Sequence, residues 1–197
     1  MDMRRQRRRP SRKAPARQHP GDLEVVLDFL RAGTGERDAL TDVQALWLDK
    51  HGLPDPGGLF NEDVRREAGI LHAGLHALAL DNSGLDFDAK AIEALNEITE
   101  VVLRLRFTQG GFSRQPSGNA WADVKAGLLT AVASAMESGR WQRVKVCADC
   151  GRHFYDVASN CCGKWCGPEC RNRASSLAFR RRHPFKFSRY AAPVSAE

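Results

Sequence analysis

All six cysteines of this 197-residue chain fall between Cys147 and Cys170. Two residues separate Cys147 from Cys150, three separate Cys166 from Cys170, and fifteen lie between the pairs. Two such pairs joined by a loop supply the four ligands of a tetrahedral zinc site, since Zn²⁺ binds thiolates readily. Clustered cysteines in a chain without a secretion signal indicate metal binding rather than a disulfide framework. We therefore predict that these four cysteines bind one Zn²⁺.

The remaining cysteines, Cys161 and Cys162, are adjacent and follow Asn160 in an expected hairpin turn. Neighbouring side chains rarely point at one metal ion, so the simplest interpretation is that neither is a ligand. Two alternatives are a redox-sensitive thiol pair and a substitute ligand. His153 and His183 are weaker replacement ligands.

The second cysteine pair leads into a predicted helix. Pro168 suits the first position of a helix, and Pro184 disfavours helix at the preceding residue, so the helix should run to about Arg182. The tight turn that carries Cys147 and Cys150, here called the knuckle, is predicted to be followed by a hairpin and then this helix. That order is typical of a treble-clef-like zinc finger. Such a module is too small to fold without its metal. The inward face of the helix is expected to comprise Cys170, Ala174, Leu177 and Ala178.

The other faces of this helix carry side chains suited to DNA. Asn and Arg make bidentate contacts with adenine and guanine edges, and clustered basic residues contact phosphates. The predicted DNA-contacting residues are Arg171, Asn172, Arg173, Ser176, Arg180, Arg181, Arg182 and Lys186.

The charge distribution supports an anionic partner. Residues 1–20 carry a net charge of +7, residues 21–139 carry −9, and residues 140–190 carry +9. Basic segments flanking an acidic middle are typical of proteins that bind nucleic acid or another anionic surface. The proline- and arginine-rich residues 1–20 are expected to form a disordered basic arm.

The acidic middle is predicted to be mostly helical. Apolar residues recur at helical spacing over 61–80 and over 121–139, where Trp121, Val124, Leu128, Val132 and Ala135 should face inward. Shorter helices are expected over 22–30 and 43–50. A further helix should place Ile92, Leu95, Thr99 and Val102 on one face.

A small β-hairpin should interrupt these helices. Residues 103–107 alternate apolar and basic side chains, and Gly110-Gly111 suggests a turn before a partner strand near 112–115. The predicted fold is therefore mostly α. It consists of a basic arm (1–20), a helical domain with a small hairpin (21–140), a zinc finger (145–183) and a tail (184–197).

The helical region shows no convincing catalytic pattern. His72 and His76 are spaced to bind one metal ion, but they lie beside the apolar stripe without an evident third ligand, so boundary histidines are the simpler interpretation. The sequence has no phosphate-binding loop, no nucleophile elbow and no His-Glu-x-x-His motif. We predict a non-enzymatic protein. No apolar h-region follows the arginine-rich start, so a cytoplasmic location without membrane insertion is expected.

The cysteine module resembles the CGNR zinc-finger family. The matching residues are Cys147, Cys150, Phe154, Asp156, Asn160, Trp165-Cys166 and Cys170-Arg171-Asn172-Arg173. Arg171 stands where the family signature has glycine. A helical backbone at this position tolerates arginine in place of glycine. Members usually join this finger to an N-terminal helical ABATE domain, and Leu27-Asp28-Phe29-Leu30 and 103–107 are similar to that domain.

The resemblance implies a bacterial transcription regulator. In such a protein the finger would bind duplex DNA with Zn²⁺ as cofactor, and the ABATE domain would sense a stress, a ligand or a partner. Two other interpretations remain open: a zinc-finger module that binds RNA or protein, and an enzyme acting through the helical domain. Stacking of Phe185, Phe187 and Tyr190 on single-stranded bases would favour the RNA alternative.

Overall fold

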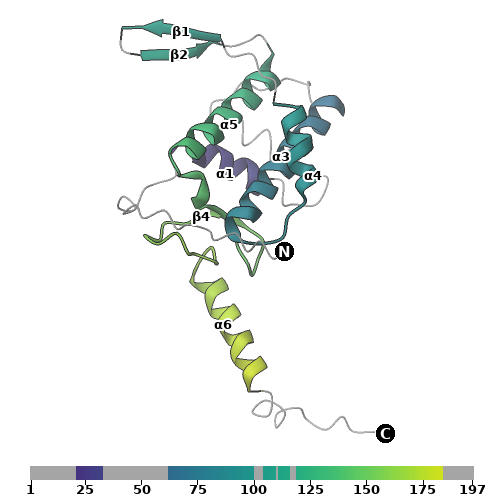
Figure 1. Ribbon diagram of the computed structural model, residues 1–197, viewed down its shortest axis with the longest axis vertical. Coiled ribbons are helices and arrows are strands. Elements are labelled where there is room, and N and C mark those ends of the chain that lie inside the picture. The colour runs from purple at the N-terminus through teal and green to yellow at the C-terminus, as the bar shows by residue number, and fades with distance from the viewer. Residues whose placement is uncertain (1–20, 33–61, 100–103, 110, 116–118, 184–197) are drawn as a thin grey trace, which may run out of the picture.

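The computed structural model describes residues 21–32, 62–99, 104–109, 111–115 and 119–183, and these form a mostly helical protein followed by a small cysteine-containing module (Figure 1). This agrees with the predicted fold class. The elements in chain order are α1 (Leu23–Ala32), α3 (Glu62–Ser83), α4 (Ala89–Glu97), β1 (Arg104–Thr108), β2 (Gly111–Gln115), α5 (Ala120–Glu137), the 3-10 turn η1 (Trp141–Arg143), β3 (Val144–Val146), β4 (His153–Tyr155) and α6 (Pro168–Arg182).

The main core lies where α1 packs against α3 and α5. Its buried side chains recur at helical spacing, as the sequence predicts for both long helices. All five expected inward residues of α5 are buried: Trp121, Val124, Leu128, Val132 and Ala135. Polar contacts link the same helices at their edge, because Glu67 on α3 accepts hydrogen bonds from Trp121 Nε1 (2.9 Å) and Lys125 Nζ (2.8 Å) on α5. No described helix is long and apolar enough to cross a membrane.

One helix is shorter than expected. α4 ends at Glu97, because Ile98 leaves the helix and its N–H caps the carbonyls of Leu95 and Asn96. Thr99 therefore does not extend the predicted apolar face, and that expectation was wrong. Val102, like the helix predicted over 43–50, lies outside the described residues.

The predicted hairpin is present. β1 and β2 pair in antiparallel register, with Phe107 opposite Phe112 and Thr108 opposite Gly111 next to the turn. The hairpin lies at the opposite end of the structure from α6 (Figure 1).

A second antiparallel hairpin, β3 and β4, forms the start of the cysteine module, with Val146 opposite His153. The Cys147–Cys150 knuckle lies in the turn of this hairpin, whereas the expected order placed the knuckle before it. Cys161 and Cys162 follow β4 in a separate loop, so their expected place in a hairpin turn was wrong.

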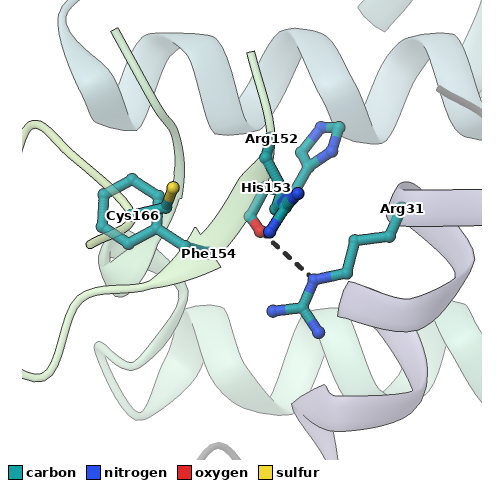
Figure 2. Close-up of a pocket in the computed structure, with 5 residues that line it drawn as sticks. All are labelled: Arg31, Arg152, His153, Phe154 and Cys166. Atoms are coloured by element: carbon teal, nitrogen blue, oxygen red, sulfur yellow. Dashed lines mark hydrogen bonds between the residues drawn. The ribbon is translucent and has the colours of Figure 1, made fainter. Parts of the chain in front are cut away.

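The helical part and the cysteine module share one core. Val144 and Val146 of β3 are buried in the same cluster as the helices. Asn82 at the end of α3 donates through Nδ2 to the carbonyls of Trp141 (2.8 Å) and Val144 (3.0 Å), and Val146 N donates to the Ser83 hydroxyl. At the end of α1, Arg31 Nε donates to the carbonyl of His153 in β4 at 3.2 Å (Figure 2). The two parts are therefore held together by both apolar packing and hydrogen bonds between side chains and the backbone.

Candidate metal centre

Four cysteine sulfurs meet at one point. The sulfurs of Cys147, Cys150, Cys166 and Cys170 all lie within 4.8 Å of one another. Cys150 and Cys166 Sγ are 3.6 Å apart, and Cys166 and Cys170 Sγ are 3.7 Å apart. A tetrahedron of thiolates around Zn²⁺ at ~2.3 Å requires sulfur separations of about 3.8 Å. The donor set and its spacing therefore fit Zn²⁺, and the chain carries a four-cysteine zinc site.

The first cysteine pair is held by the knuckle backbone. Cys147 N donates to the carbonyl of Arg152 (2.9 Å), and Gly151 N donates back to the carbonyl of Cys147 (3.0 Å). Gly151 has φ +71°, the left-handed conformation predicted for this turn, which glycine adopts without steric cost. The turn thereby places Cys147 and Cys150 on one side of the hairpin.

The second pair is positioned by the start of α6. Pro168 occupies the first turn of the helix, as the sequence predicts, and Cys170 lies in the same turn and is buried. Cys166 N donates to Cys147 Sγ at 3.4 Å, which joins the two halves of the site. Cys170 therefore links the sulfur cluster to the first turn of α6.

The hydrogen bonds also affect the acidity of the thiols. Burial by itself raises the pKa of Cys147, but backbone N–H groups, including that of Cys166, lower it to about 6. Burial raises the pKa of Cys166 and of Cys170. The backbone N–H groups therefore favour the thiolate form of Cys147, and a bound Zn²⁺ would favour the thiolate form of the other ligands.

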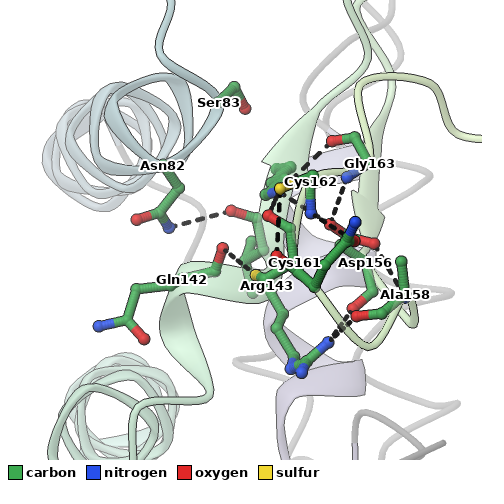
Figure 3. Close-up of polar contacts among 12 residues, drawn as sticks. Asn82, Ser83, Gln142, Arg143, Asp156, Ala158, Cys161, Cys162 and Gly163 are labelled. Atoms are coloured by element: carbon green, nitrogen blue, oxygen red, sulfur yellow. Dashed lines mark hydrogen bonds and ion pairs between the residues drawn. The ribbon is translucent and has the colours of Figure 1, made fainter. Parts of the chain in front are cut away.

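A buried ion pair supports the loop between the cysteine pairs. Lys145 Nζ on β3 contacts Asp156 Oδ2 at 2.8 Å, and both side chains are almost fully buried. Asp156 also accepts from Ala158 N (3.0 Å) and Gly163 N (2.7 Å), the second of which is shown in Figure 3. A Cβ at Gly163 would lie 2.7 Å from Asp156 Oδ1, so only glycine permits this close approach.

The adjacent cysteines lie in this supported loop and outside the sulfur cluster. Cys161 has φ +52°, and its carbonyl accepts from Lys145 Nζ at 2.6 Å. Its sulfur faces the carbonyl of Gln142, whereas the Cys162 sulfur faces the carbonyl of Asn160 (Figure 3). Within the described residues, the four-cysteine group is the only metal-binding cluster, so the two thiols are not ligands in this arrangement. His153 and His183 are not part of it either.

Most of α6 is exposed to solvent. Of the expected inward face, Cys170 is buried and Ala174 is partly buried, but Leu177 and Ala178 are exposed, so that expectation was wrong beyond the first turn. The reason is that α6 extends away from the rest of the protein after its first turn (Figure 1). The predicted DNA-contacting residues on α6 are all exposed, and Lys186 lies outside the described residues.

One of these residues has a partner within the finger. Arg173 pairs with Asp149 of the knuckle, with Nη2 at 2.5 Å and Nε at 2.8 Å from Oδ2. Its Nη2 also lies 3.5 Å from Cys170 Sγ, where the guanidinium offsets the negative charge of a thiolate. Arg173 therefore stabilises the metal centre directly. No local pattern predicts this pair, because Asp149 and Arg173 are 24 positions apart.

Three histidines meet where the finger contacts α3. His76 Nδ1 and His153 Nε2 are 2.9 Å apart and share a hydrogen bond. His72 Nε2 contacts the carbonyl of Leu30 at 3.0 Å and therefore donates to it. The simpler interpretation of His72 and His76, as residues at the edge of the core, agrees with these contacts. Their contact with His153 could not be inferred from helical spacing.

The pH dependence of stability should report on this contact. Burial, and then the neighbouring His76, His72 and Arg31, lower the pKa of His153 to about 3. Because the folded-state pKa lies below the ordinary value of ~6.5, the stabilisation is complete above pH 6.5 and is lost as pH falls toward 3. Between pH 7.5 and 5.5 the wild type should lose about 1.4 kcal/mol more unfolding free energy than His153→Phe. Urea denaturation at the two pH values measures the difference.

The exposed His183 provides the control for this measurement. His183→Phe should keep the pH dependence of the wild type, and any release of zinc in acid affects all three proteins. Identical pH dependence in His153→Phe and the wild type would contradict the assignment.

Two family models match the chain in succession. The ABATE model, described as "Putative stress-induced transcription regulator", matches residues 23–137, and the CGNR zinc-finger model matches residues 143–183. A search of curated proteins finds no match. The second match contains all four cysteines of the metal centre, and the first contains α1, α3, α4 and α5.

Proposed function

Because the chain belongs to the ABATE family of transcription regulators and carries a CGNR zinc finger, we propose that it is a zinc-dependent regulator that binds duplex DNA through α6. Both families are regulator and zinc-finger types rather than enzymes. We further propose that the helical domain senses a ligand or partner and that the finger responds.

The observation that carries this proposal is the exposed, basic surface of α6. The helix contains five arginines against one glutamate, and only Cys170 among its fifteen residues is buried. A helix of this length spans about 22 Å, and the major groove of B-DNA is wide enough to accept it. Since α6 begins at a zinc ligand, metal binding would hold it at a fixed angle to the finger.

The exposed side chains on α6 divide into two proposed roles. Asn172, Ser176 and Arg180 recur every four residues and therefore share one face, where they would contact base edges. The remaining arginines, together with Lys186, would contact phosphates: Arg171, Arg173, Arg181 and Arg182. Arg173 pairs with Asp149 through Nε and Nη2, so the other side of its guanidinium group would contact a phosphate.

The proposed link between sensing and DNA binding is the shared core. β3 is buried against α3, and β4 contacts α1 through Arg31. A shift of α1 or α3 would therefore change the position of the hairpin that holds the first cysteine pair. Such a shift would alter the placement of α6 relative to DNA.

A test of the DNA-binding surface compares two sets of arginines. Replacing Arg180, Arg181 and Arg182 together with Gln should weaken duplex binding. It should also make the negative slope of log K against log salt shallower by up to about 2.7, since each lost phosphate contact accounts for ~0.9. Replacing Arg65 and Arg66, which are exposed on α3, should leave both unchanged. Fluorescence anisotropy over a salt series with zinc-loaded protein measures the affinity, using duplexes selected from a random library.

Asn172→Ala tests base recognition separately. It should reduce affinity for the selected duplex by ~1–3 kcal/mol and leave affinity for a scrambled duplex unchanged, if the side chain makes a bidentate base contact. Equal loss on both duplexes would show that α6 does not recognise bases. Failure of the wild type to bind any duplex at low salt would rule out the proposed function.

The second candidate function is binding of a protein or RNA through the same helix. Leu177 and Phe179 on α6 are 46% and 43% exposed, and the Phe179 ring lies 4.5 Å from the ring of His183 at the end of the helix. Binding to single-stranded RNA in preference to duplex DNA, or to neither, would favour this alternative.

A further inference from the structure

A cavity of about 470 Å³ lies between α1 and the finger. Its volume falls within the range of ~300–1,000 Å³ that is usual for small-molecule sites in proteins. Figure 2 shows the side chain of Arg31 reaching from the end of α1 toward β4. The residues that line the cavity are Arg31, Arg152, His153, Phe154 and Cys166.

Among the described residues that line the cavity, two are arginines and none is acidic. Arg31 is held in place by its hydrogen bond to the carbonyl of His153 and by its ion pair with Asp28 at 3.2 Å. Within the described part of the chain, the side chain of Arg152 makes no hydrogen bond or ion pair. Two arginines that line one cavity, one of them without a partner among the described residues, favour an oxyanion.

The nearby zinc centre does not account for these two arginines. A zinc ion with four thiolates carries a net charge of −2, and neighbouring cations offset that charge. Arg173 already contacts the sulfur of Cys170 in this way. Neither Arg31 nor Arg152 forms a hydrogen bond with a cysteine sulfur among the described residues.

The rest of the lining is apolar or neutral. Phe154 is 8% exposed and packs with Cys147 and Cys170. The imidazole of His153 is fully buried and forms a hydrogen bond with His76, and burial favours its neutral form. An occupant would therefore place its charged group at the arginines and an apolar group against Phe154.

We propose that this cavity binds a small organic anion, a carboxylate or phosphate monoester attached to an apolar group. The site joins α1 of the helical domain to β4 and Cys166 of the finger, so its occupant would contact both parts. Binding itself is independent of DNA. Only the expected consequence, a change in DNA affinity, rests on the function proposed above.

Calorimetry on full-length, zinc-loaded protein tests the proposal with phenyl phosphate, benzoate, inorganic phosphate and the neutral benzyl alcohol. Phenyl phosphate and benzoate should bind, phenyl phosphate more tightly than inorganic phosphate, and benzyl alcohol should not bind. Arg152→Gln should weaken both organic anions tenfold or more. Arg65→Gln, a matched change at an exposed arginine of α3, should leave them unchanged.

Stoichiometric zinc in Arg152→Gln is the folding control, because the exposed Arg152 side chain makes no hydrogen bond or ion pair with another described residue. The proposal is overturned if neither organic anion binds at millimolar concentration, or if Arg152→Gln binds both as tightly as the wild type. If the wild type binds neither organic anion and Arg152→Gln has lost affinity for DNA, Arg152 would instead contact a DNA phosphate. If the anions bind but no duplex does, the site stands and the proposed function fails.

Discussion

Replacing Cys170 with serine is expected to abolish stoichiometric zinc binding and to unfold α6 together with the loop that precedes it. The finger has only a small core of its own, in which Cys147, Phe154 and Cys170 are the buried members. A structural zinc site supplies ~10–16 kcal/mol of apparent binding free energy, which a core of this size cannot replace. The helical domain should remain folded, because its core includes β3 of the finger but none of these three residues. Metal analysis and far-UV circular dichroism measure the two effects.

The adjacent cysteines are the matched control. Replacing Cys161 and Cys162 together with serine should leave one zinc per chain, because both sulfurs face backbone carbonyls rather than the sulfur cluster. Full zinc content in Cys170→Ser would contradict the ligand assignment. Cys161, Cys162 or His183 would then be the candidates for the fourth ligand.

Replacing Lys145 with methionine should destabilise the protein by roughly 3–5 kcal/mol, because the buried Asp156 carboxylate would lose its cationic partner. Lys145 lowers the pKa of Asp156 against the opposing effect of burial. The loop from Asp156 to Gly163 depends on this carboxylate, so zinc affinity should fall as well. Urea denaturation of the zinc-loaded protein measures the free energy of unfolding.

Two further variants separate the ion pair from loss of a lysine side chain. Lys164→Met removes an exposed lysine from the same loop and should change stability by less than about 0.5 kcal/mol. In the double variant Lys145→Met with Asp156→Asn, no buried charge remains, so the destabilisation should be smaller than the sum of the single changes. Additive effects would show that Lys145 and Asp156 do not stabilise each other.

Local sequence patterns were sufficient for the helices and the metal ligands. Helical periodicity identified α3 and α5, and Pro168 and Pro184 marked the limits of α6 because proline restricts the backbone in a known way. The two cysteine spacings identified the ligand set, since a zinc site needs four donors that can meet at one point. The family resemblance drawn from the same residues agrees with both family matches.

Contacts between distant segments were decided only by the tertiary structure. The position of the knuckle inside the β3–β4 hairpin depends on strand register, which cysteine spacing does not contain. The exposure of Leu177 depends on how far α6 extends beyond the sulfur cluster. The spacing of apolar residues along α6 does not contain this information. Arg31 lies 122 positions from His153, and no local rule connects them.

The sequence by itself therefore determined the helices, the zinc ligands and the basic character of α6, because each follows from residues close together in the chain. The tertiary structure decided which polar groups pair. It placed Lys145 against Asp156, His76 against His153 and Arg173 against Asp149. Buried and partly buried polar groups need partners, but many side chains of the right chemistry are available along the chain. The fold of the finger brings together the first and third pairs, and the packing of α3 against the finger brings together the second.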